Sequence, residues 1–231
     1  MNIRPFKFKT PTTIALFAPP YSGKSTLTRK ILKNADVLFD NPPKLVVYCY
    51  NQWLPMLEDM KDDFTDGFFI PHEGVPTKES IENWMELTKG VNSNEASKHF
   101  IIVLDDLQQQ CQKEKSSAEM FTVGSHHSNY TIIYLCHNIF GRGQYSRTIS
   151  INSHYFILFR NNRDTQQVRI LARQIMNRNS EYFIDAYNKA VALPWGYLVV
   201  DIHPTTTDKD YKLLTGIIPG ERTIIYTPRR Q

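Results

Sequence analysis

Residues 18–26, Ala-Pro-Pro-Tyr-Ser-Gly-Lys-Ser-Thr, have the residue types that bind nucleotide phosphates. The segment fits the end of the P-loop pattern G-x-x-x-x-G-K-[ST], in which a glycine lets backbone N–H groups surround the phosphates. Lys24 would place a positive charge beside the outer phosphates, and the hydroxyl of Ser25 would bind Mg²⁺. Ala18 stands where the pattern has its first glycine, and the two prolines after it have no N–H group. We therefore expect ATP or GTP with Mg²⁺ as cofactors, bound through Ser22, Gly23, Lys24, Ser25 and Thr26.

Two neighbouring aspartates follow a run of five apolar residues at 100–104. This arrangement is typical of a Walker B strand, and Asp105 at its end would hold the magnesium ion through water, together with Ser25. Asp106 would then polarise the attacking water as a general base. The alternative is that both aspartates cap the next helix.

A third polar group, Cys136-His137-Asn138, follows the apolar run 131–135. A polar side chain at this place would sense the γ-phosphate and position water, and His137 and Asn138 are equal candidates for that catalytic role. A histidine satisfied by local hydrogen bonds is the alternative for His137. A zinc site is disfavoured because usable ligand spacing is lacking among His126, His127, Cys136 and His137.

These polar groups must be positioned by strands and helices. Apolar, β-prone runs predict strands over 12–17, 45–50, 67–70, 100–104, 131–136, 155–159, 197–202 and 224–226. Helical spacing of apolar residues predicts helices over 25–33, 79–88, 117–126 and 181–192, and one more that follows Asp164 as its N-cap and runs through Ile175. Strands alternating with helices indicate an α/β fold with a largely parallel sheet, whose ligands lie beyond the carboxyl ends of the strands.

Length and composition favour an ordinary globular protein. With 231 residues, 41% of them apolar, the chain suits one domain over residues 1–231. Its apolar runs are far shorter than the ~20 residues of a membrane span, and its first nine residues lack the apolar core of a signal peptide. We expect an intracellular protein with no membrane partner. Cys49, Cys111 and Cys136 form no C-x-x-C pair, so buried, reduced thiols are expected.

The formal charge of +4 is unevenly distributed. Residues 1–35 carry seven basic side chains and no acidic one, and residues 142–178 carry seven arginines against the single Asp164. The segment 58–119 between them is acidic. Segregation of this kind suggests a polyanionic partner such as DNA or nucleotide phosphates. Solvated helix faces around one active site explain the pattern equally well.

The order of the motifs resembles a known family. After the P-loop come Ile-Val-Leu-Asp-Asp-Leu at 102–107, Ile-Ile-Tyr-Leu-Cys-His-Asn-Ile-Phe at 132–140 and Ser-Arg-Thr-Ile-Ser-Ile-Asn-Ser-His-Tyr at 146–155. This series is similar to FtsK/HerA-type genome-packaging ATPases, specifically the poxvirus-type packaging ATPases of small DNA viruses and virus-like transposons such as adintoviruses and Polintons. Segments 159–164, 171–174 and 196–201 look like the downstream motifs of that family. The likeness covers residues 12–220, and His137 departs from it where family members often have glutamine.

The resemblance implies a P-loop NTPase of the additional-strand, catalytic-glutamate (ASCE) type, RecA-like, with extra C-terminal strands. It also implies a homo-oligomeric ring that hydrolyses ATP and pumps double-stranded DNA into a preformed capsid. Capsid or portal-vertex proteins would be further partners, at a nuclear or cytoplasmic assembly site of the host cell, with transient virion association.

In ring ATPases an arginine from the neighbouring subunit stabilises the charge that develops on the γ-phosphate. The candidates for this catalytic role are Arg147, Arg160 and Arg163, and an ordinary surface arginine is the alternative for each. The basic loop 141–145 would contact the DNA backbone, or be a plain solvated loop.

Two functions of other classes are also open. In a small-molecule kinase the arginine-rich segment 160–178 would form a lid over the phosphates, although the sequence shows no convincing acceptor site. In a nucleotide-dependent capsid-assembly switch, binding would order a capsid contact and hydrolysis would be slow. The short side chain of Asp106 and the missing first glycine are compatible with such a switch.

Overall fold

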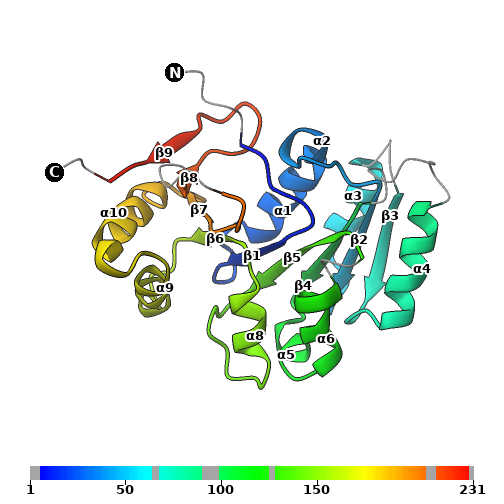
Figure 1. Cartoon of the computed structure of the whole chain (residues 1–231). Coiled ribbons are helices and arrows are strands. Elements are labelled where there is room, and N and C mark those ends of the chain that lie inside the picture. The colour runs from blue at the N-terminus through cyan, green and yellow to red at the C-terminus, as the bar shows by residue number, and fades with distance from the viewer. Residues whose placement is uncertain (1–5, 64–67, 90–98, 125–127, 207–211, 229–231) are drawn as a thin grey trace.

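The computed structural model describes residues 6–63, 68–89, 99–124, 128–206 and 212–228. Nine strands in these ranges form one sheet in the order β3-β2-β4-β5-β1-β6-β7-β8-β9 (Figure 1). The strands are β1 (Thr13–Phe17), β2 (Leu45–Tyr50), β3 (Phe68–Glu73), β4 (Phe100–Asp105), β5 (Tyr130–Cys136), β6 (Tyr155–Phe159), β7 (Tyr197–Asp201), β8 (Leu213–Thr215) and β9 (Ile224–Tyr226).

Strands β3, β2, β4, β5, β1 and β6 run parallel, and β7, β8 and β9 extend the sheet in antiparallel fashion. Strand β5 is hydrogen-bonded to β1 on one side and to β4 on the other. A strand inserted between the P-loop strand and the Walker B strand is the additional strand of the ASCE type. The expected α/β fold, largely parallel with extra C-terminal strands, is therefore confirmed.

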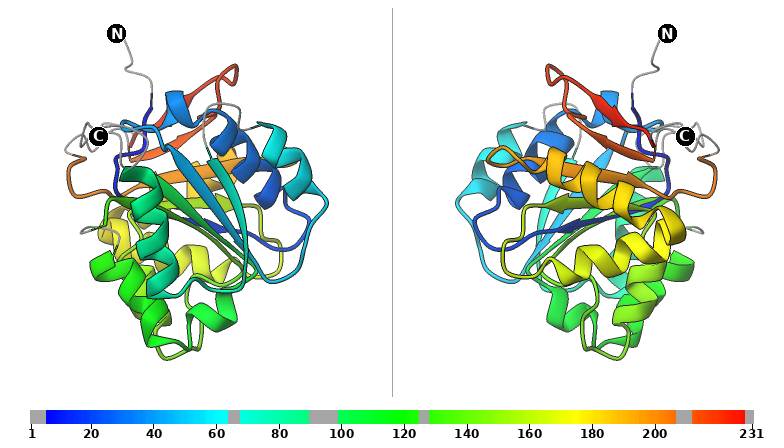
Figure 2. Two further views of the ribbon diagram at one scale, coloured as in Figure 1. Left: turned by 90° about the vertical axis from the view of Figure 1, so that its right-hand side faces the viewer. Right: turned by 90° about the vertical axis from the view of Figure 1, so that its left-hand side faces the viewer.

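Helices cover both faces of this sheet (Figure 2). One face packs against α1 (Lys24–Lys33), α2 (Ala35–Leu38) and α3 (Met56–Asp63). The opposite face packs against α4 (Lys78–Lys89), α5 (Gln108–Cys111), α6 (Lys115–Glu119), the π-helical turn η2 (Met120–Gly124), α8 (Ser146–Ile151), α9 (Gln166–Met176) and α10 (Ser180–Ala190), with the 3₁₀ turn η3 (Asn177–Asn179) joining the last two.

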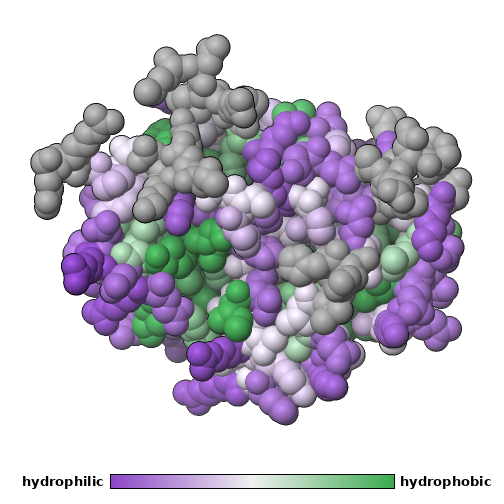
Figure 3. Space-filling model, viewed as in Figure 1, coloured by the Kyte–Doolittle hydropathy of each residue, from purple (hydrophilic) through white to green (hydrophobic). Residues whose placement is uncertain are grey.

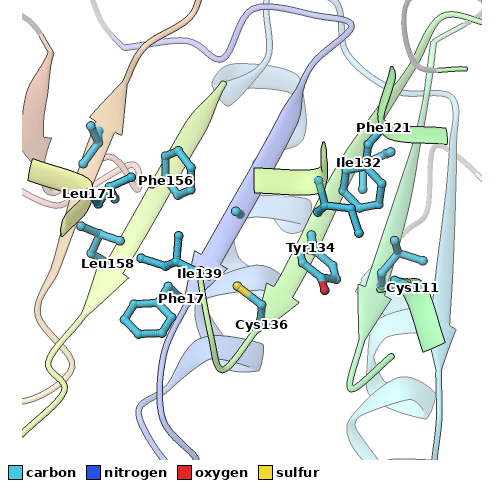
Figure 4. Packing of buried hydrophobic residues seen from close by; sticks show 14 of the residues in the cluster. Phe17, Cys111, Phe121, Ile132, Tyr134, Cys136, Ile139, Phe156, Leu158 and Leu171 are labelled. Atoms are coloured by element: carbon cyan, nitrogen blue, oxygen red, sulfur yellow. The ribbon is translucent and has the colours of Figure 1, made fainter. Parts of the chain in front are cut away.

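The apolar core consists of two clusters, one on each face, because successive side chains of a strand point to opposite sides. In β1, Ala15 and Phe17 belong to one cluster and Ile14 and Leu16 to the other. Figure 4 shows the first cluster, where Phe17 lies beside residues of β5 and β6 and Leu171 of α9 packs on the same face. The three cysteines are free and buried, as expected.

Several elements differ from the sequence-based expectation. The helix expected over 117–126 is α6 followed by the π-helical turn η2, and its last residues lie outside the described ones. Helix α9 begins at Gln166 with Thr165 as its N-cap, so the predicted cap at Asp164 is one residue early; the Asp164 carboxylate nevertheless accepts the N–H of Gln167 at 3.4 Å. Helices α2, α3, α5 and α8 and strand β8 were not predicted. Each spans only three to eight residues, too few for a periodic pattern to stand out.

The outer surface seen in Figure 3 is mostly hydrophilic, with apolar side chains gathered in smaller areas. Among the described helices, none has the length and apolar character needed to cross a membrane.

Candidate functional site

A cleft of about 370 Å³ lies at the carboxyl edge of the sheet, where β1, β4 and β5 end. We call it the phosphate cleft. It is lined by residues 19–26 of the P-loop segment, by Tyr50, Gln52 and Leu54 around the end of β2, and by three residues predicted for hydrolysis. Those three are Asp105, Asp106 and His137. The structure therefore brings the three predicted motifs to one place.

The P-loop turns from β1 into α1 at Gly23, whose φ of +89° favours glycine. The first hydrogen bond of the helix runs from the N–H of Leu27 to the carbonyl of Gly23 at 2.8 Å. The amides that precede Leu27 in α1 thus have no partner inside the helix. The buried hydroxyl of Ser22 also has no hydrogen-bond partner among the described residues. Free donors around a helix N-terminus match the oxygens of an anionic phosphate.

The ammonium group of Lys24 is largely buried, with 8% of the residue exposed. This burial lowers the pKa of Lys24, and the carboxylates of Asp105 and Asp106 offset part of the effect. A buried cation of this kind gains from an anion placed beside it. The side chain is therefore positioned for a phosphate group rather than for solvent.

Asp105 is also buried, and its carboxylate accepts a 2.7 Å hydrogen bond from the hydroxyl of Tyr48. Burial raises the pKa of Asp105, whereas the bond from Tyr48 lowers it. The hydroxyl of Ser25 lies 3.5 Å from the same carboxylate oxygen. Hydroxyl and carboxylate oxygens are ligands that Mg²⁺ accepts, usually together with water and substrate phosphates. The predicted metal pair fits a magnesium ion held directly or through water.

Asp106 is exposed, with a φ of +56°, a left-handed conformation that aspartate adopts more readily than most residues. It lines the phosphate cleft and also a second cleft of about 650 Å³. The N-cap of the following helix α5 is Leu107, and no side chain caps it. The alternative that the two aspartates cap this helix is therefore wrong.

His137 lines both clefts as well, whereas Asn138 lines only the second. Nδ1 of His137 lies 2.9 Å from the carbonyl oxygen of Ala18, which can only accept, so we assign the ring proton to Nδ1. The 3.5 Å approach of the Lys24 ammonium to Nδ1 is then a contact between two donors. His137 does have the local hydrogen bond of the alternative interpretation, and it also borders the phosphate cleft.

Residues 137–140, which we call the sensor segment, are held by two glutamine side chains. Oε1 of Gln108 accepts the N–H groups of residues 137 and 138 at 2.8 and 3.3 Å, and its Nε2 donates to the carbonyl of Asn138 at 2.6 Å. Oε1 of Gln167 accepts the N–H groups of residues 139 and 140 at 2.7 and 3.4 Å. Nε2 of Gln167 donates to the side chain of Asn138 at 3.1 Å. The two glutamines thus fix the position of His137.

The three candidate arginines lie outside both clefts of their own chain. Arg160 and Arg163 are exposed after the end of β6, and Nε of Arg160 donates to Asn162 at 3.1 Å. Arg147 is exposed on α8. Arg142 of the loop 141–145 is the one that lines the second cleft.

Sequence reasoning missed Tyr48, Gln108 and Gln167. A tyrosine inside an otherwise apolar strand was a usable signal, because a buried phenol needs a hydrogen-bond partner. The glutamine run at 108–110 directly after the two aspartates was a second signal. His126 and His127 of the disfavoured zinc site lie outside the described residues.

No protein-family model and no curated protein sequence matches the chain. Among solved structures, the genome packaging NTPase B204 of Sulfolobus turreted icosahedral virus 2, in complex with ATP-gammaS, matches with a TM-score of 0.53 and 12% identity. The DNA-packaging ATPase B204 of Sulfolobus Turreted Icosahedral Virus matches with a TM-score of 0.51 and 11% identity. Each match covers 95% of this chain and 98% of the other. The chain has a P-loop NTPase fold.

Proposed function

We propose that the protein is an ATP-hydrolysing motor that packages double-stranded DNA into a preformed capsid. The observation that carries this proposal is the phosphate cleft, in which the P-loop faces Asp105, Asp106 and His137. Its support for DNA as the substrate is the fold shared, at low identity, with viral genome-packaging NTPases. The motif series of the sequence points to the same class of protein.

Different residues of the phosphate cleft would bind the phosphates, hold the metal ion and activate the attacking water. Backbone amides at the start of α1 and the ammonium of Lys24 would bind the β- and γ-phosphates. Ser25 and Asp105 would hold Mg²⁺, which neutralises charge on the phosphates when bound. Asp106 would take a proton from water as the water oxygen bonds to the γ-phosphorus and the bond to the bridging oxygen breaks. His137 would orient that water, and ADP and phosphate would leave.

Movement of DNA requires contacts that do not depend on base sequence. Exposed arginines after β6 and on α8 suit phosphate contacts, and a ring of subunits would bring Arg147, Arg160 or Arg163 to a neighbour's cleft. Capsid or portal-vertex proteins and an intracellular assembly site belong to the same proposal. Binding of DNA would weaken steeply as salt increases.

The test is ATP hydrolysis by the purified protein with and without linear double-stranded DNA. We expect DNA to raise turnover several-fold and Lys24→Ala to abolish it, whereas Lys78→Ala, at a lysine whose side chain is 90% exposed, leaves turnover unchanged. Turnover that needs Lys24 but ignores DNA would refute the motor and favour the kinase or the assembly switch. Absence of any turnover dependent on Lys24 would refute hydrolysis at this cleft.

A further inference from the structure

A separate cleft of about 550 Å³ lies next to the P-loop. It shares Gly23 and Thr26 with the phosphate cleft, and contains none of the residues predicted for hydrolysis. Its walls come from α1, from the segment 194–197 and from the C-terminal part of the chain. The lining residues beyond the two shared ones are Leu27, Lys30, Phe159, Pro194, Trp195, Tyr197 and Glu221. We call it the side cleft.

The order of the two clefts along the P-loop gives a direction to any nucleotide bound there. Asp106 and His137 line the phosphate cleft and do not line the side cleft, so the reacting γ-phosphate belongs at the phosphate-cleft end. The sugar and base of the bound nucleotide would then extend past Thr26, a residue that the two clefts share, toward the side cleft. We propose that the side cleft binds the base of the nucleotide, with the indole ring of Trp195 as its stacking surface. This inference rests on the proposed nucleotide binding and deepens it.

Trp195 has the exposure and the position that stacking requires. The residue is 74% exposed, although it is one of the largest apolar side chains of the protein. Its ring lies against the P-loop, because a Cβ atom added to Gly23 would stand 3.0 Å from Cδ1 of Trp195. Its backbone has a φ of +59°, which is rare for a bulky residue. An indole face held open beside the phosphate site is a suitable surface for a nucleobase.

The polar side chains of the side cleft complement a base that carries an amino group. Glu221 is the one acidic residue among the described residues that line it. Oε2 of Glu221 accepts a 2.7 Å hydrogen bond from Tyr197, which fixes the carboxylate at the cleft wall. The carboxylate would accept an N–H from the amino group of adenine or guanine. Lys30 lies one helical turn beyond Thr26 on the same face of α1 and also lines the side cleft. The side cleft therefore favours a base that carries an amino group over one that lacks it.

The test compares ligands with and without a base. Calorimetry would measure binding of Mg²⁺-ATP and of Mg²⁺-tripolyphosphate to the unmodified protein and to Trp195→Ala. We expect Trp195→Ala to weaken ATP about tenfold, the size of one base–aromatic stack, and to leave tripolyphosphate unchanged. Trp195→Phe would retain most of the ATP affinity. Leu193→Ala is the matched control, since Leu193 is 75% exposed in the same loop but does not line the side cleft.

A second comparison addresses the carboxylate. Inosine triphosphate lacks the amino group of ATP, so Glu221→Gln is expected to reduce the preference for ATP over inosine triphosphate. Thermal unfolding of each variant would confirm that it is folded. Both measurements use the full chain.

The outcomes separate this inference from the proposed function. If the unmodified protein binds neither ligand, the nucleotide site itself is refuted. If it binds ATP and Trp195→Ala binds ATP equally well, the base-stacking role is overturned; a simultaneous loss of self-association in that variant would assign Trp195 to a subunit contact. If Trp195→Ala weakens ATP and tripolyphosphate equally, the ring acts by supporting Gly23 and the inference is also overturned.

Discussion

Replacing Tyr48 by phenylalanine should lower the stability of the protein, because it removes a buried hydrogen bond to the Asp105 carboxylate. The Tyr48 hydroxyl and the carboxylate are both buried, and the 2.7 Å bond between them is to a charged group. Such a bond contributes about 1.5–3 kcal/mol. For a protein of this length, that loss lowers the melting temperature by roughly 3–12 °C at pH 7.

The loss of stability caused by Tyr48→Phe should be smaller at low pH than at neutral pH. Burial already raises the pKa of Asp105 in the folded protein, and loss of the Tyr48 donor raises it further. A folded-state pKa above the unfolded one means that the ionised carboxylate destabilises the fold and that acid relieves this cost. At a pH low enough to protonate Asp105 in both states, Tyr48→Phe loses only a neutral bond of about 0.5–1.5 kcal/mol. The acid limb of ATP hydrolysis should move to higher pH, because the proposed Mg²⁺ site needs the ionised carboxylate of Asp105.

The assay is urea-induced unfolding at several pH values, combined with a pH profile of ATP hydrolysis. Tyr130→Phe is the matched control, because its buried hydroxyl donates to the carbonyl of Met120 at 3.2 Å, a neutral acceptor. That control should cost less and show no such pH dependence. Equal costs for the two variants at neutral pH, with an unmoved acid limb, would contradict the role given to Tyr48.

Three further substitutions test other parts of the site. Lys24→Met should reduce turnover at least about 100-fold, because it removes a group that stabilises transition-state charge. It should also raise the melting temperature, because a buried cation is removed, and a lower melting temperature would contradict the cost assigned to that burial. Gln108→Met removes three hydrogen bonds to the sensor segment, so we expect the free energy of unfolding to fall by about 2–3 kcal/mol. Turnover should also fall, with unchanged ATP affinity. The control is Gln109→Met, at an exposed glutamine, which should behave as the unmodified protein. Gly23→Ala should cost about 1–2 kcal/mol in unfolding experiments, since φ is +89° there, and unchanged stability would show that the loop adopts another backbone conformation.

Motifs with a fixed order along the chain were predictable, because their chemistry needs particular residue types at strand ends. The P-loop and the two aspartates are of this kind, and β2 and β6 were predicted with the bounds they have. Contacts between distant segments were not predictable. The bond from Tyr48 to Asp105 joins residues 57 positions apart, and no local pattern encodes it.

Short elements escaped prediction for a different reason. Helix α5 has four residues, three of them glutamine, so the sequence shows no apolar stripe that would predict it. The sequence likewise did not predict Trp195 as a site residue. Its contact with Gly23 depends on the pairing of β7 with β6, which joins distant parts of the chain.

The two glutamines that hold the sensor segment also determine how that segment moves. All four of its consecutive backbone N–H groups donate to side-chain oxygens, two to Gln108 and two to Gln167. Amide hydrogens in an irregular loop normally exchange quickly with solvent, whereas these four should exchange only when a glutamine swings away. Gln167 belongs to α9, so a rotation of that helix would release the second half of the loop while Gln108 still restrains the first. The sensor segment lines the second cleft together with Asp106, and two separate helices, α5 and α9, therefore control its opening independently.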